Sequence, residues 1–371
     1  MAGQSMLRLA GLAACSAVLV LGCGNDAPDP APAATSPAPA APGALPRITI
    51  LATGGTIAGK ANANSAVGYT AGEATAQDLI DAVPGLDKIA TLDAVQVSNI
   101  GSQDMNDEVW LDLATRINQI FAEDRADGVV ITHGTDTLEE TAFFLDHVVA
   151  SPKPVVLVGS MRPSTALSAD GPANLRSAVQ VAADPRARGR GAMVVLNDTI
   201  HGADDVTKTN TTSVQTFVSP NTGPIGHVDA AAVQFARPAQ DRQRLTFPVP
   251  GAAPLPRVAI VYSHAGMDAT AVDDALGHGA RGLVLAGVGD GNTAKPVVDA
   301  LSGAARRGVL VARSSRVGSG SVVRNAELND DELGTVSALG LNPAKARILV
   351  QLLLTQGITD PAEAQRKFAD S

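Results

Sequence analysis

The sequence predicts an α/β fold with two domains, each built on a mainly parallel open sheet with helices on both faces. Seven short aliphatic runs end in Gly, Ser, Thr, Asp or His: "RITILATGG", "GVVITHGTD", "PVVLVGSMRP", "AMVVLNDTI", "RVAIVYSHAG", "GLVLAGVGDGN" and "GVLVARSS". Runs that are apolar along their whole length are typical of parallel strands covered on both faces. Helical stretches separate the runs, as in 107–123, where Val109, Leu113, Ile117 and Ile120 form one stripe.

The composition fits a globular protein and argues against a nucleic-acid partner. The chain has 371 residues, of which 45% are hydrophobic, enough to bury one large core or two moderate ones. Its formal net charge is −9 and only 3% of its residues are aromatic. Binding to nucleic acid normally requires a basic surface or a platform of stacking aromatic rings, so neither feature favours it.

Residues 1–22 have the features of a secretory signal. Arg8 precedes an apolar segment, 9–21, which is about half as long as a membrane-spanning helix. The segment ends in "VLGCG", which resembles a bacterial lipobox, so we expect cleavage before Cys23 and attachment of lipid to this cysteine. An exported, periplasmic, membrane-anchored lipoprotein follows from this interpretation, and an ordinary secreted protein is the alternative. Without Cys15, no disulfide can form within the mature chain.

The rest of the chain divides into a tether, two domains and a linker. Residues 23–46 are mostly Ala and Pro, a composition that favours extended chain over a packed core. A segment rich in Pro and charge, 237–256, interrupts the regular pattern. We place the boundary there, with an N-terminal α/β catalytic domain at 47–240, a linker at 241–256 and a C-terminal α/β domain at 257–371.

Two turns with the same composition mark a candidate ligand site. In "ATGGTIAG" (52–59) and "THGTDT" (132–137) an apolar strand runs into glycine and then into Thr56 or Thr135. Ligands of open α/β sheets collect at the carboxyl ends of the strands, and glycine lets the backbone approach them closely. We therefore expect both threonines in solvent-reachable turns of one small-molecule pocket. A threonine that only caps a helix is the alternative, and the lysine of a P-loop is missing.

A threonine nucleophile needs a base nearby, and the sequence offers three candidates. His133 alternates with Thr132 along a strand, which favours a buried structural histidine. Lys208 lies among short polar side chains in "DVTKTNTT", and partial desolvation would lower its pKa, although a surface lysine is an open alternative. Tyr69 occurs in "NANSAVGYTAGEAT", a segment expected to be a mobile flap. The histidines are scattered and no HExxH or CxxC spacing occurs, so no metal site is predicted.

Six stretches in order resemble the bacterial type II L-asparaginases and glutaminase-asparaginases. They are "LATGGTIAG", "NIGSQDMND", "ITHGTDTLEETAFFLD", "MRPSTALSADGPANL", "DVTKTNTT" and "LNPAKARILVQLLLT", within residues 45–368. The resemblance implies the two-domain asparaginase-like fold and hydrolysis of the side-chain amide of L-asparagine, through an acyl-threonine intermediate and without a cofactor. It also implies a homotetramer whose sites are shared between subunits.

The resemblance assigns a role to each candidate residue. Thr56 corresponds to the nucleophile, with Tyr69 on the flap beside it. Thr135 corresponds to the threonine that the family pairs with Asp136 and Lys208. The substrate-binding groups implied by the family are the backbone at Gly55 and Gly134, the side chains of Ser102 and Gln103, and Asp136, which would hold the α-amino group. Glu327 in "RNAELND" matches a glutamate donated by a neighbouring subunit.

Two alternatives to a pure asparaginase stay open. One is a glutaminase-asparaginase with substantial hydrolysis of L-glutamine. "VYSHAGMD" places Gly266 where relatives often carry Asn or Ser, so the preference between the two substrates is not set by the motifs. The other alternative is a surface lipoprotein that binds an amino acid without hydrolysing it.

Overall fold

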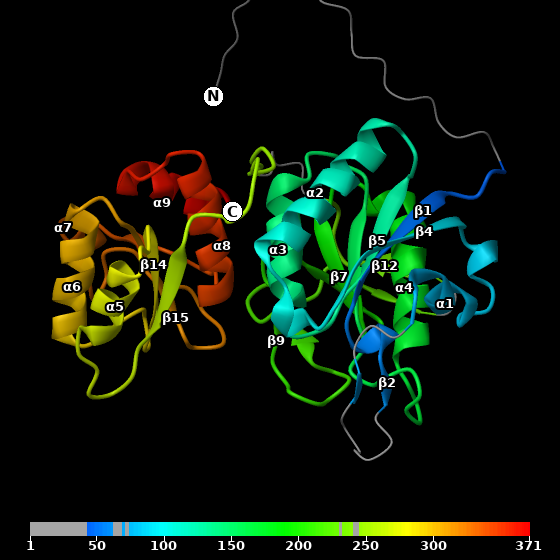
Figure 1. Ribbon diagram of the computed structural model, residues 1–371, viewed down its shortest axis with the longest axis horizontal. Coiled ribbons are helices and arrows are strands. Elements are labelled where there is room, and N and C mark those ends of the chain that lie inside the picture. Colours follow the sequence, from blue (N-terminus) through cyan, green and yellow to red (C-terminus); the bar gives the residue numbers. More distant parts are fainter. Residues whose placement is uncertain (1–42, 62–68, 71–73, 230–231, 240–244) are drawn as a thin grey trace, which may run out of the picture. The chain divides into compact units, whose positions relative to one another are not determined.

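Two sheets organise the chain in the computed structural model, which describes residues 43–61, 69–70, 74–229, 232–239 and 245–371. The strands of the larger sheet are β1 (Arg47–Gly54), β4 (Thr91–Ile100), β5 (Gly128–Thr132), β6 (Val155–Val158), β7 (Ala192–Leu196), β8 (Thr199–Gly202), β11 (Gly226–Val228) and β12 (Val233–Phe235). Their spatial order is β12-β11-β8-β7-β6-β5-β1-β4. Strands β4, β1, β5, β6 and β7 run parallel, and β8, β11 and β12 extend the sheet antiparallel (Figure 1).

Helices cover both faces of this sheet. They are α1 (Ala76–Asp81), α2 (Asp107–Ala122), α3 (Leu138–Val148) and α4 (Gly171–Ala183), with short 3-10 turns at Thr56–Ala58, Leu86–Lys88, Ser102–Asp104 and Pro185–Ala187. Successive residues of a strand point to opposite faces. Val129 and Ile131 of β5 therefore pack with α2 and α3, whereas Val130 packs with α1 and α4. This double cover explains why β5 is apolar throughout.

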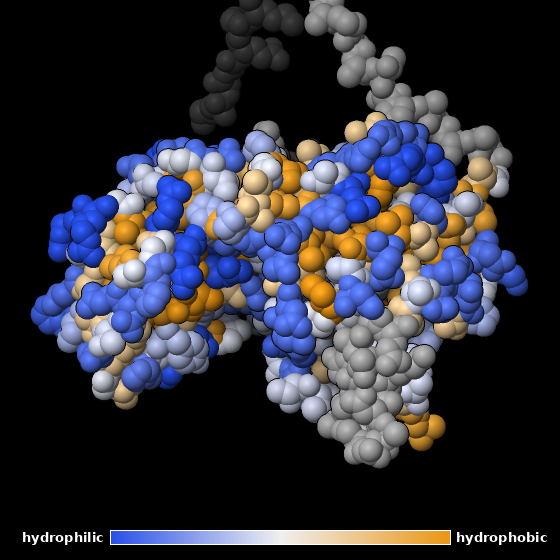
Figure 2. Space-filling model, in the orientation of Figure 1, coloured by the Kyte–Doolittle hydropathy of each residue, from blue (hydrophilic) through white to orange (hydrophobic). Residues whose placement is uncertain are grey.

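The smaller sheet repeats this arrangement. Its strands, all parallel, are β13 (Val258–Tyr262), β14 (Gly282–Gly287), β15 (Leu310–Ser315) and β16 (Val336–Ser337). The helices of this part are α5 (Thr270–Gly277), α6 (Lys295–Arg306), α7 (Asp330–Leu333), α8 (Pro343–Thr355) and α9 (Pro361–Asp370). Helices α5 and α6 pack on one face and α8 on the other. The outer surface of α6 is hydrophilic (Figure 2), and its Lys295 and Asp299 form an ion pair at 2.8 Å.

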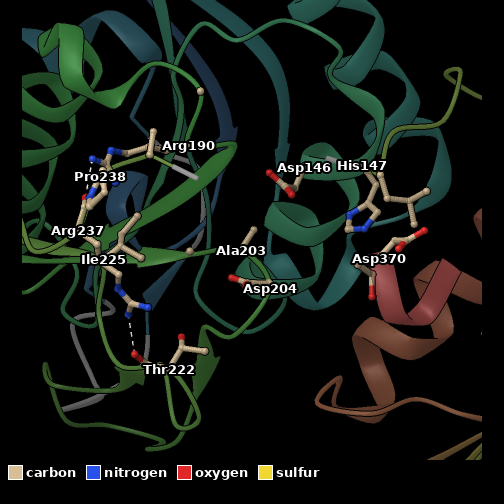
Figure 3. A pocket seen from close by; sticks show the side chains of 15 residues that line it. Asp146, His147, Arg190, Ala203, Asp204, Thr222, Ile225, Arg237, Pro238 and Asp370 are labelled. Atoms are coloured by element: carbon tan, nitrogen blue, oxygen red, sulfur yellow. Dashed lines mark hydrogen bonds between the residues drawn. The ribbon is translucent and has the colours of Figure 1, made fainter. Parts of the chain in front are cut away.

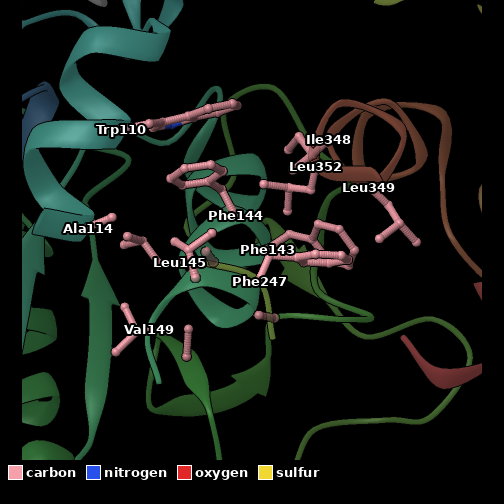
Figure 4. Close-up of a cluster of buried hydrophobic side chains, with 14 of the residues drawn as sticks. Trp110, Ala114, Phe143, Phe144, Leu145, Val149, Phe247, Ile348, Leu349 and Leu352 are labelled. Atoms are coloured by element: carbon pink, nitrogen blue, oxygen red, sulfur yellow. The ribbon is translucent and has the colours of Figure 1, made fainter. Parts of the chain in front are cut away.

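Helix α8 also packs against α3, so one apolar cluster joins the layers of both sheets. Figure 4 shows Phe143 and Phe144 of α3 close to Ile348, Leu349 and Leu352 of α8. Trp110 of α2 stacks on Phe144 with ring centroids 5.0 Å apart. Each of these aromatic side chains contributes a large apolar area, so the cluster fixes how α3 and α8 lie against each other.

The α/β prediction is confirmed, and all seven aliphatic runs form strands. Four strands of the large sheet were not predicted. Strand β4 alternates polar and apolar residues because it is an edge strand with side chains partly open to solvent. Strands β8, β11 and β12 are only three or four residues long, too short for a periodic signal.

Two further short ribbons complete the described chain. They are β9 (Thr207–Lys208) with β10 (Phe217–Val218), and β2 (Lys60–Ala61) with β3 (Tyr69–Thr70). The predictions for residues 1–22, for Cys23 and for most of the tether fall outside the described residues. Within the described chain, no helix combines the length and the apolar character needed to cross a bilayer.

A buried ion pair fixes the segment that carries Glu327. The Arg313 guanidinium of β15 donates to both carboxylate oxygens of Asp330, at 2.6 and 2.7 Å, and both side chains are buried. Burial raises the pKa of Asp330, but hydrogen bonds from Arg313, Thr335 and the Asn325 backbone outweigh it, and the net pKa is lowered. Because Asp330 begins α7, the pair anchors the chain just after Glu327.

We expect Asp330→Asn to lower the free energy of unfolding by about 3–5 kcal/mol, because it leaves the Arg313 charge buried without its partner. Denaturant unfolding followed by circular dichroism measures the change. Asp331→Asn is the matched control, since the exposed Asp331 pairs with Arg324 at the surface and should cost about 0–1 kcal/mol. Equal costs for the two variants would show that the buried pair does not anchor this segment.

Candidate active site

The two glycine-threonine turns lie side by side at the carboxyl edge of the large sheet. Strands β1 and β5 are parallel neighbours, with Ala52 opposite Thr132, and the Thr53 hydroxyl donates to the Thr132 carbonyl at 2.9 Å. A Cβ atom on Gly55 would lie 2.3 Å from the Gly134 nitrogen, and Gly55 has a φ of 80°. Only glycine combines this conformation with so close an approach. The two turns that the sequence pattern groups are therefore in direct backbone contact.

The expectation that Thr56 and Thr135 are solvent-reachable is wrong for this structure. Their exposed fractions are 4% and 5%. Thr56 begins a buried 3-10 turn directly after Gly55, and the Cγ2 atom of Thr135 lies against Gly159. Both threonine side chains are thus shielded from solvent. Polar groups shielded in this way interact more strongly than they would in water.

Lys208 reaches the second turn from the β9–β10 ribbon. Its Nζ atom donates to Thr135 Oγ1 at 2.9 Å and to Asp136 Oδ1 at 2.7 Å. The Lys208 side chain is 17% exposed and that of Asp136 is 54% exposed, so one partner is largely desolvated and the other faces solvent. The structure thus brings together the hydroxyl, the acid and the amine, although 72 residues separate Lys208 from Asp136.

Ser102 links the loop after β4 to the same turn. Its hydroxyl oxygen accepts a hydrogen bond from the Asp136 backbone N–H at 3.1 Å, and its carbonyl accepts one from the Thr137 hydroxyl at 2.7 Å. A Cβ on Gly134 would meet Ser102 Oγ at 2.6 Å, so the contact again requires glycine. Gln103 follows Ser102 in an exposed position, and its amide donates to Asp104 at 3.2 Å.

His133 is fully buried and supports the turn from behind, in agreement with the sequence interpretation. Its Nδ1–H donates to the Gly134 carbonyl at 2.6 Å. Its Nε2 atom accepts from the Thr141 hydroxyl at 2.8 Å, and the Trp110 indole N–H donates to the same hydroxyl oxygen at 2.8 Å. These partners are all satisfied by a neutral imidazole with its proton on Nδ1. Burial lowers the pKa of His133 to about 4, against a partial opposing effect of the Gly134 carbonyl.

Three other residues singled out in the sequence lie apart or are only partly described. The backbone of Tyr69 pairs with Ala61 in the β2–β3 ribbon, but its side chain is outside the described part. Glu327 is exposed, accepts a hydrogen bond from the Asn292 side chain, and, in the part of the chain that the structure describes, lines neither cavity beside Lys208. Gly266 has a φ of 73°, and no atom lies within 4 Å of the position that a Cβ would take.

The structure adds three polar residues that sequence reasoning missed. Glu139 accepts the backbone N–H of Lys208 at 2.7 Å and the side-chain amide of Asn342 at 3.2 Å. Lys345, in the first turn of α8, donates to the carbonyls of Asp204 and Val206. A signal for Lys345 existed: it is a charged residue on the apolar face of "LNPAKARILVQLLLT". No comparable sequence signal marks Glu139 or Asn342, because polar residues are common at the start of a helix.

Cavities of about 390 and 560 Å³ open beside Lys208 and Glu139. The smaller one is also lined by Asp136, and the larger one extends to Lys345 and Tyr262. A separate cavity of about 120 Å³ lies between Asp146, Arg190 and Asp370 (Figure 3), and none of the predicted site residues that the structure describes lines it. Across the described ranges, no group of three His, Cys, Asp or Glu side chains is arranged to hold a metal ion.

Comparison with known proteins identifies the family. Residues 47–241 match the model of the asparaginase N-terminal domain, and residues 257–368 match that of the glutaminase/asparaginase C-terminal domain. The chain belongs to the asparaginase family. It is 50% identical to L-asparaginase 2 of Escherichia coli K12 over 327 residues, covering 88% of this chain and 93% of that protein.

Two further relatives include one named for L-asparagine alone and one named for both L-glutamine and L-asparagine. A probable periplasmic L-asparaginase of Haemophilus influenzae is 49% identical, covering 88% of this chain and 93% of that protein. A glutaminase-asparaginase of Pseudomonas fluorescens biotype A is 43% identical, covering 87% and 90%. The alignments therefore extend over both sheets, and both of the bacterial L-asparaginases named here are more similar to the chain than this glutaminase-asparaginase is.

The buried His133 makes stability dependent on pH. Its folded pKa lies below the unfolded value of about 6.5, so its contribution is complete above that pH and is lost as the pH falls toward about 4. We expect this group alone to make the protein about 2 kcal/mol less stable at about pH 5 than at about pH 7.5. Urea unfolding at the two pH values measures the difference.

His133→Gln should remove that share of the pH dependence. His201, which burial also shifts to a pKa of about 4, keeps its own share in the variant. His278→Gln serves as the control, because His278 is exposed at the end of α5 and its loss should leave the wild-type dependence. An unchanged pH dependence in His133→Gln would mean that the imidazole can become protonated in the folded protein.

Proposed function

We propose that the protein hydrolyses the side-chain amide of L-asparagine to L-aspartate and ammonia. The observation that carries the proposal is the Lys208 ammonium within 2.9 Å of the Thr135 hydroxyl and 2.7 Å of the Asp136 carboxylate, beside the turn that holds Thr56. A hydroxyl, an amine and an acid in contact are groups that amide hydrolysis through a threonine can use. Membership of the asparaginase family supports the same reaction.

Thr56 is the proposed nucleophile. Its hydroxyl oxygen attacks the amide carbon, the proton passes to the leaving nitrogen, and ammonia departs from an acyl-threonine. Water then attacks the acyl carbon, returns a proton to Thr56 and releases aspartate. Backbone N–H groups of the two adjoining turns are candidates for stabilising the oxyanion in both steps. We assign Tyr69 to proton transfer from the flap.

Thr135 and Lys208 form the proposed proton relay. Thr135 orients the attacking group, and Lys208 holds the Thr135 oxygen and exchanges protons through it. The amine is suited to this role because it lies 2.9 Å from the Thr135 hydroxyl and its side chain is only 17% exposed. No cofactor takes part in the proposed reaction.

Asp136, Ser102 and Gln103 are proposed to hold the amino-acid end of the substrate. Asp136 faces solvent and carries the charge that an α-amino group needs, and Ser102 lies within hydrogen-bonding distance of its backbone. Gly55 and Gly134 contribute close backbone contacts. Recognition at this end leaves the side-chain amide directed at the threonines.

Asparagine is the preferred substrate in this proposal, because the three bacterial relatives named L-asparaginase, at 45–50% identity, are more similar than the glutaminase-asparaginases, at 41–43%. Gly266 provides no side chain where the family often has Asn or Ser, so a parallel assay with L-glutamine is part of the test. The catalytic residues other than Glu327 belong to the proposed domain at 47–240, and a linker at 241–256 leads to the second domain.

We further propose an exported homotetramer with shared sites. Glu327 is exposed on an anchored segment, away from the site of its own chain, as a residue donated to a neighbour must be. Export to the periplasm agrees with the name of the Haemophilus influenzae relative, a probable periplasmic L-asparaginase. The signal at 1–22 and a lipid anchor on Cys23 are the proposed means of export and retention.

Purified protein should release ammonia from L-asparagine, and Thr56→Ala and Thr135→Val should each lower this activity more than tenfold. Both substitutions remove a reacting hydroxyl, and Thr135→Val keeps the shape of the side chain. A coupled ammonia assay measures the rates, and thermal unfolding checks that the variants fold. A binding protein without activity would give no ammonia in the wild type, and a variant with more than about a tenth of wild-type turnover would contradict the role assigned to that threonine.

Shared sites predict complementation between two inactive variants. Glu327→Ala and Thr135→Ala are co-expressed with different tags, and oligomers carrying both tags are isolated. In a mixed pair one site collects both defects and the other collects neither, so activity should return. The separately purified variants are the control. Mixed oligomers as inactive as both parents would mean that Glu327 does not serve a neighbouring chain.

A further inference from the structure

Lys208 lies on a part of the chain that has little support of its own. Strand β9 contains only Thr207 and Lys208, and it pairs with the equally short β10. An isolated two-stranded ribbon is marginally stable in water at best. The position of the Lys208 amine, 2.9 Å from the Thr135 oxygen, therefore requires other contacts.

Glu139 supplies the most direct of these contacts. Its Oε2 atom accepts the Lys208 backbone N–H at 2.7 Å, and its Oε1 atom accepts the Asn342 side-chain N–H at 3.2 Å. Glu139 lies in the first turn of α3, three residues after Asp136. One helix start thus holds Lys208 at both ends: Thr135 and Asp136 bind its amine, and Glu139 binds its backbone.

Helix α8 holds the same segment from the other side. Asn342 caps α8 by accepting the Lys345 N–H at 3.0 Å, so its side-chain oxygen is engaged and its N–H group faces Glu139. The buried Lys345 amine donates to the carbonyls of Asp204 and Val206, at 3.0 and 2.5 Å, just before β9. The chain that leads into Lys208 is therefore clamped between α3 and α8.

We propose that Glu139 is a positioning residue for catalysis: its carboxylate, braced by Asn342, fixes the backbone of Lys208 so that the amine reaches Thr135. The proposal rests on the proposed role of Lys208 in proton transfer. Glu139 acts through Lys208, since its two carboxylate oxygens bind the Lys208 backbone and Asn342.

The geometry requires two acceptor atoms on one side chain. Glutamine at 139 keeps one oxygen for the Lys208 N–H but places an amide donor against the donor of Asn342. Alanine removes both contacts. Aspartate keeps the charge, but its carboxylate is one methylene shorter and cannot reach both donors. These three substitutions therefore remove the hydrogen bonds of Glu139 to different extents.

The test measures kcat and KM for L-asparagine in Glu139→Ala, Glu139→Gln and Glu139→Asp. We expect Glu139→Ala to lower kcat about 100-fold, as a misplaced catalytic group does. KM should change less than about threefold, because Asp136 and Ser102 keep their positions. Glu139→Gln should recover at least about tenfold of the loss in kcat, since it keeps the bond to Lys208. A general weakening of the fold would not give this split between kcat and KM.

Glu140→Ala is the matched control. Glu140 is the next residue of α3, and its carboxylate also binds α8, through Arg347 at 3.3 Å, but it does not touch Lys208. We expect its kcat to stay within about twofold of the wild type. Lys208→Met and the double variant Lys208→Met/Glu139→Ala complete the set. If Glu139 acts through Lys208, its removal should cost less than about twofold once Lys208 is absent.

The outcomes separate this proposal from the proposed reaction. Wild-type kcat in Glu139→Ala together with a strongly lowered but measurable kcat in Lys208→Met overturns the positioning role and leaves the reaction standing. Wild-type kcat in Lys208→Met overturns the positioning role of Glu139 and the role of Lys208 in proton transfer, whereas the hydrolysis of asparagine still stands. Equal losses in Glu139→Ala and Glu140→Ala, or additive losses in the double variant, also overturn the positioning role. If Glu139→Ala does not fold, Glu139→Asp decides, and wild-type kcat in that variant rejects the proposal.

Discussion

The site depends on the contact between two backbones, at Gly55 and Gly134. No side chain fits between them, because a Cβ on Gly55 would lie 2.3 Å from the Gly134 nitrogen. This approach brings together the turn after β1, which holds Thr56, and the turn after β5, which holds Thr135, and both threonines are buried. Parallel pairing of the two strands sets the register. The positions of the two threonine turns therefore depend on a contact between main-chain atoms.

Helix α3 holds the turn after β5 rigidly in place. It starts directly after the Thr135 turn, and its first residues point in several directions: Glu139 toward the Lys208 backbone, Glu140 toward Arg347 of α8, and Thr141 toward His133. Its apolar side packs on α2 and α8. A helix held in this way cannot shift without breaking buried contacts, so the turn at its start is held too.

Much of the fold and the heart of the site could be predicted from the sequence, because both rest on local patterns. Aliphatic runs that end in glycine and threonine indicated the strands and their polar ends, and Lys208 stood out among short polar side chains. Burial of Thr56 could not be predicted, since it arises from two turns 79 residues apart meeting. The contact between Glu139 and Asn342 could not be predicted for the same reason, because the two residues are 203 positions apart in the sequence.

The single tryptophan has a consequence of a different kind. Trp110 is the only indole in the chain, it is buried, and its N–H reaches His133 through one hydroxyl. Its ring also stacks on Phe144 in the cluster between α2 and α3. The protein therefore carries an intrinsic fluorescent probe that is three hydrogen bonds away from the Gly134 carbonyl. Its fluorescence emission reports on the packing next to the Thr135 turn without any added label. Activity measurements do not give this information.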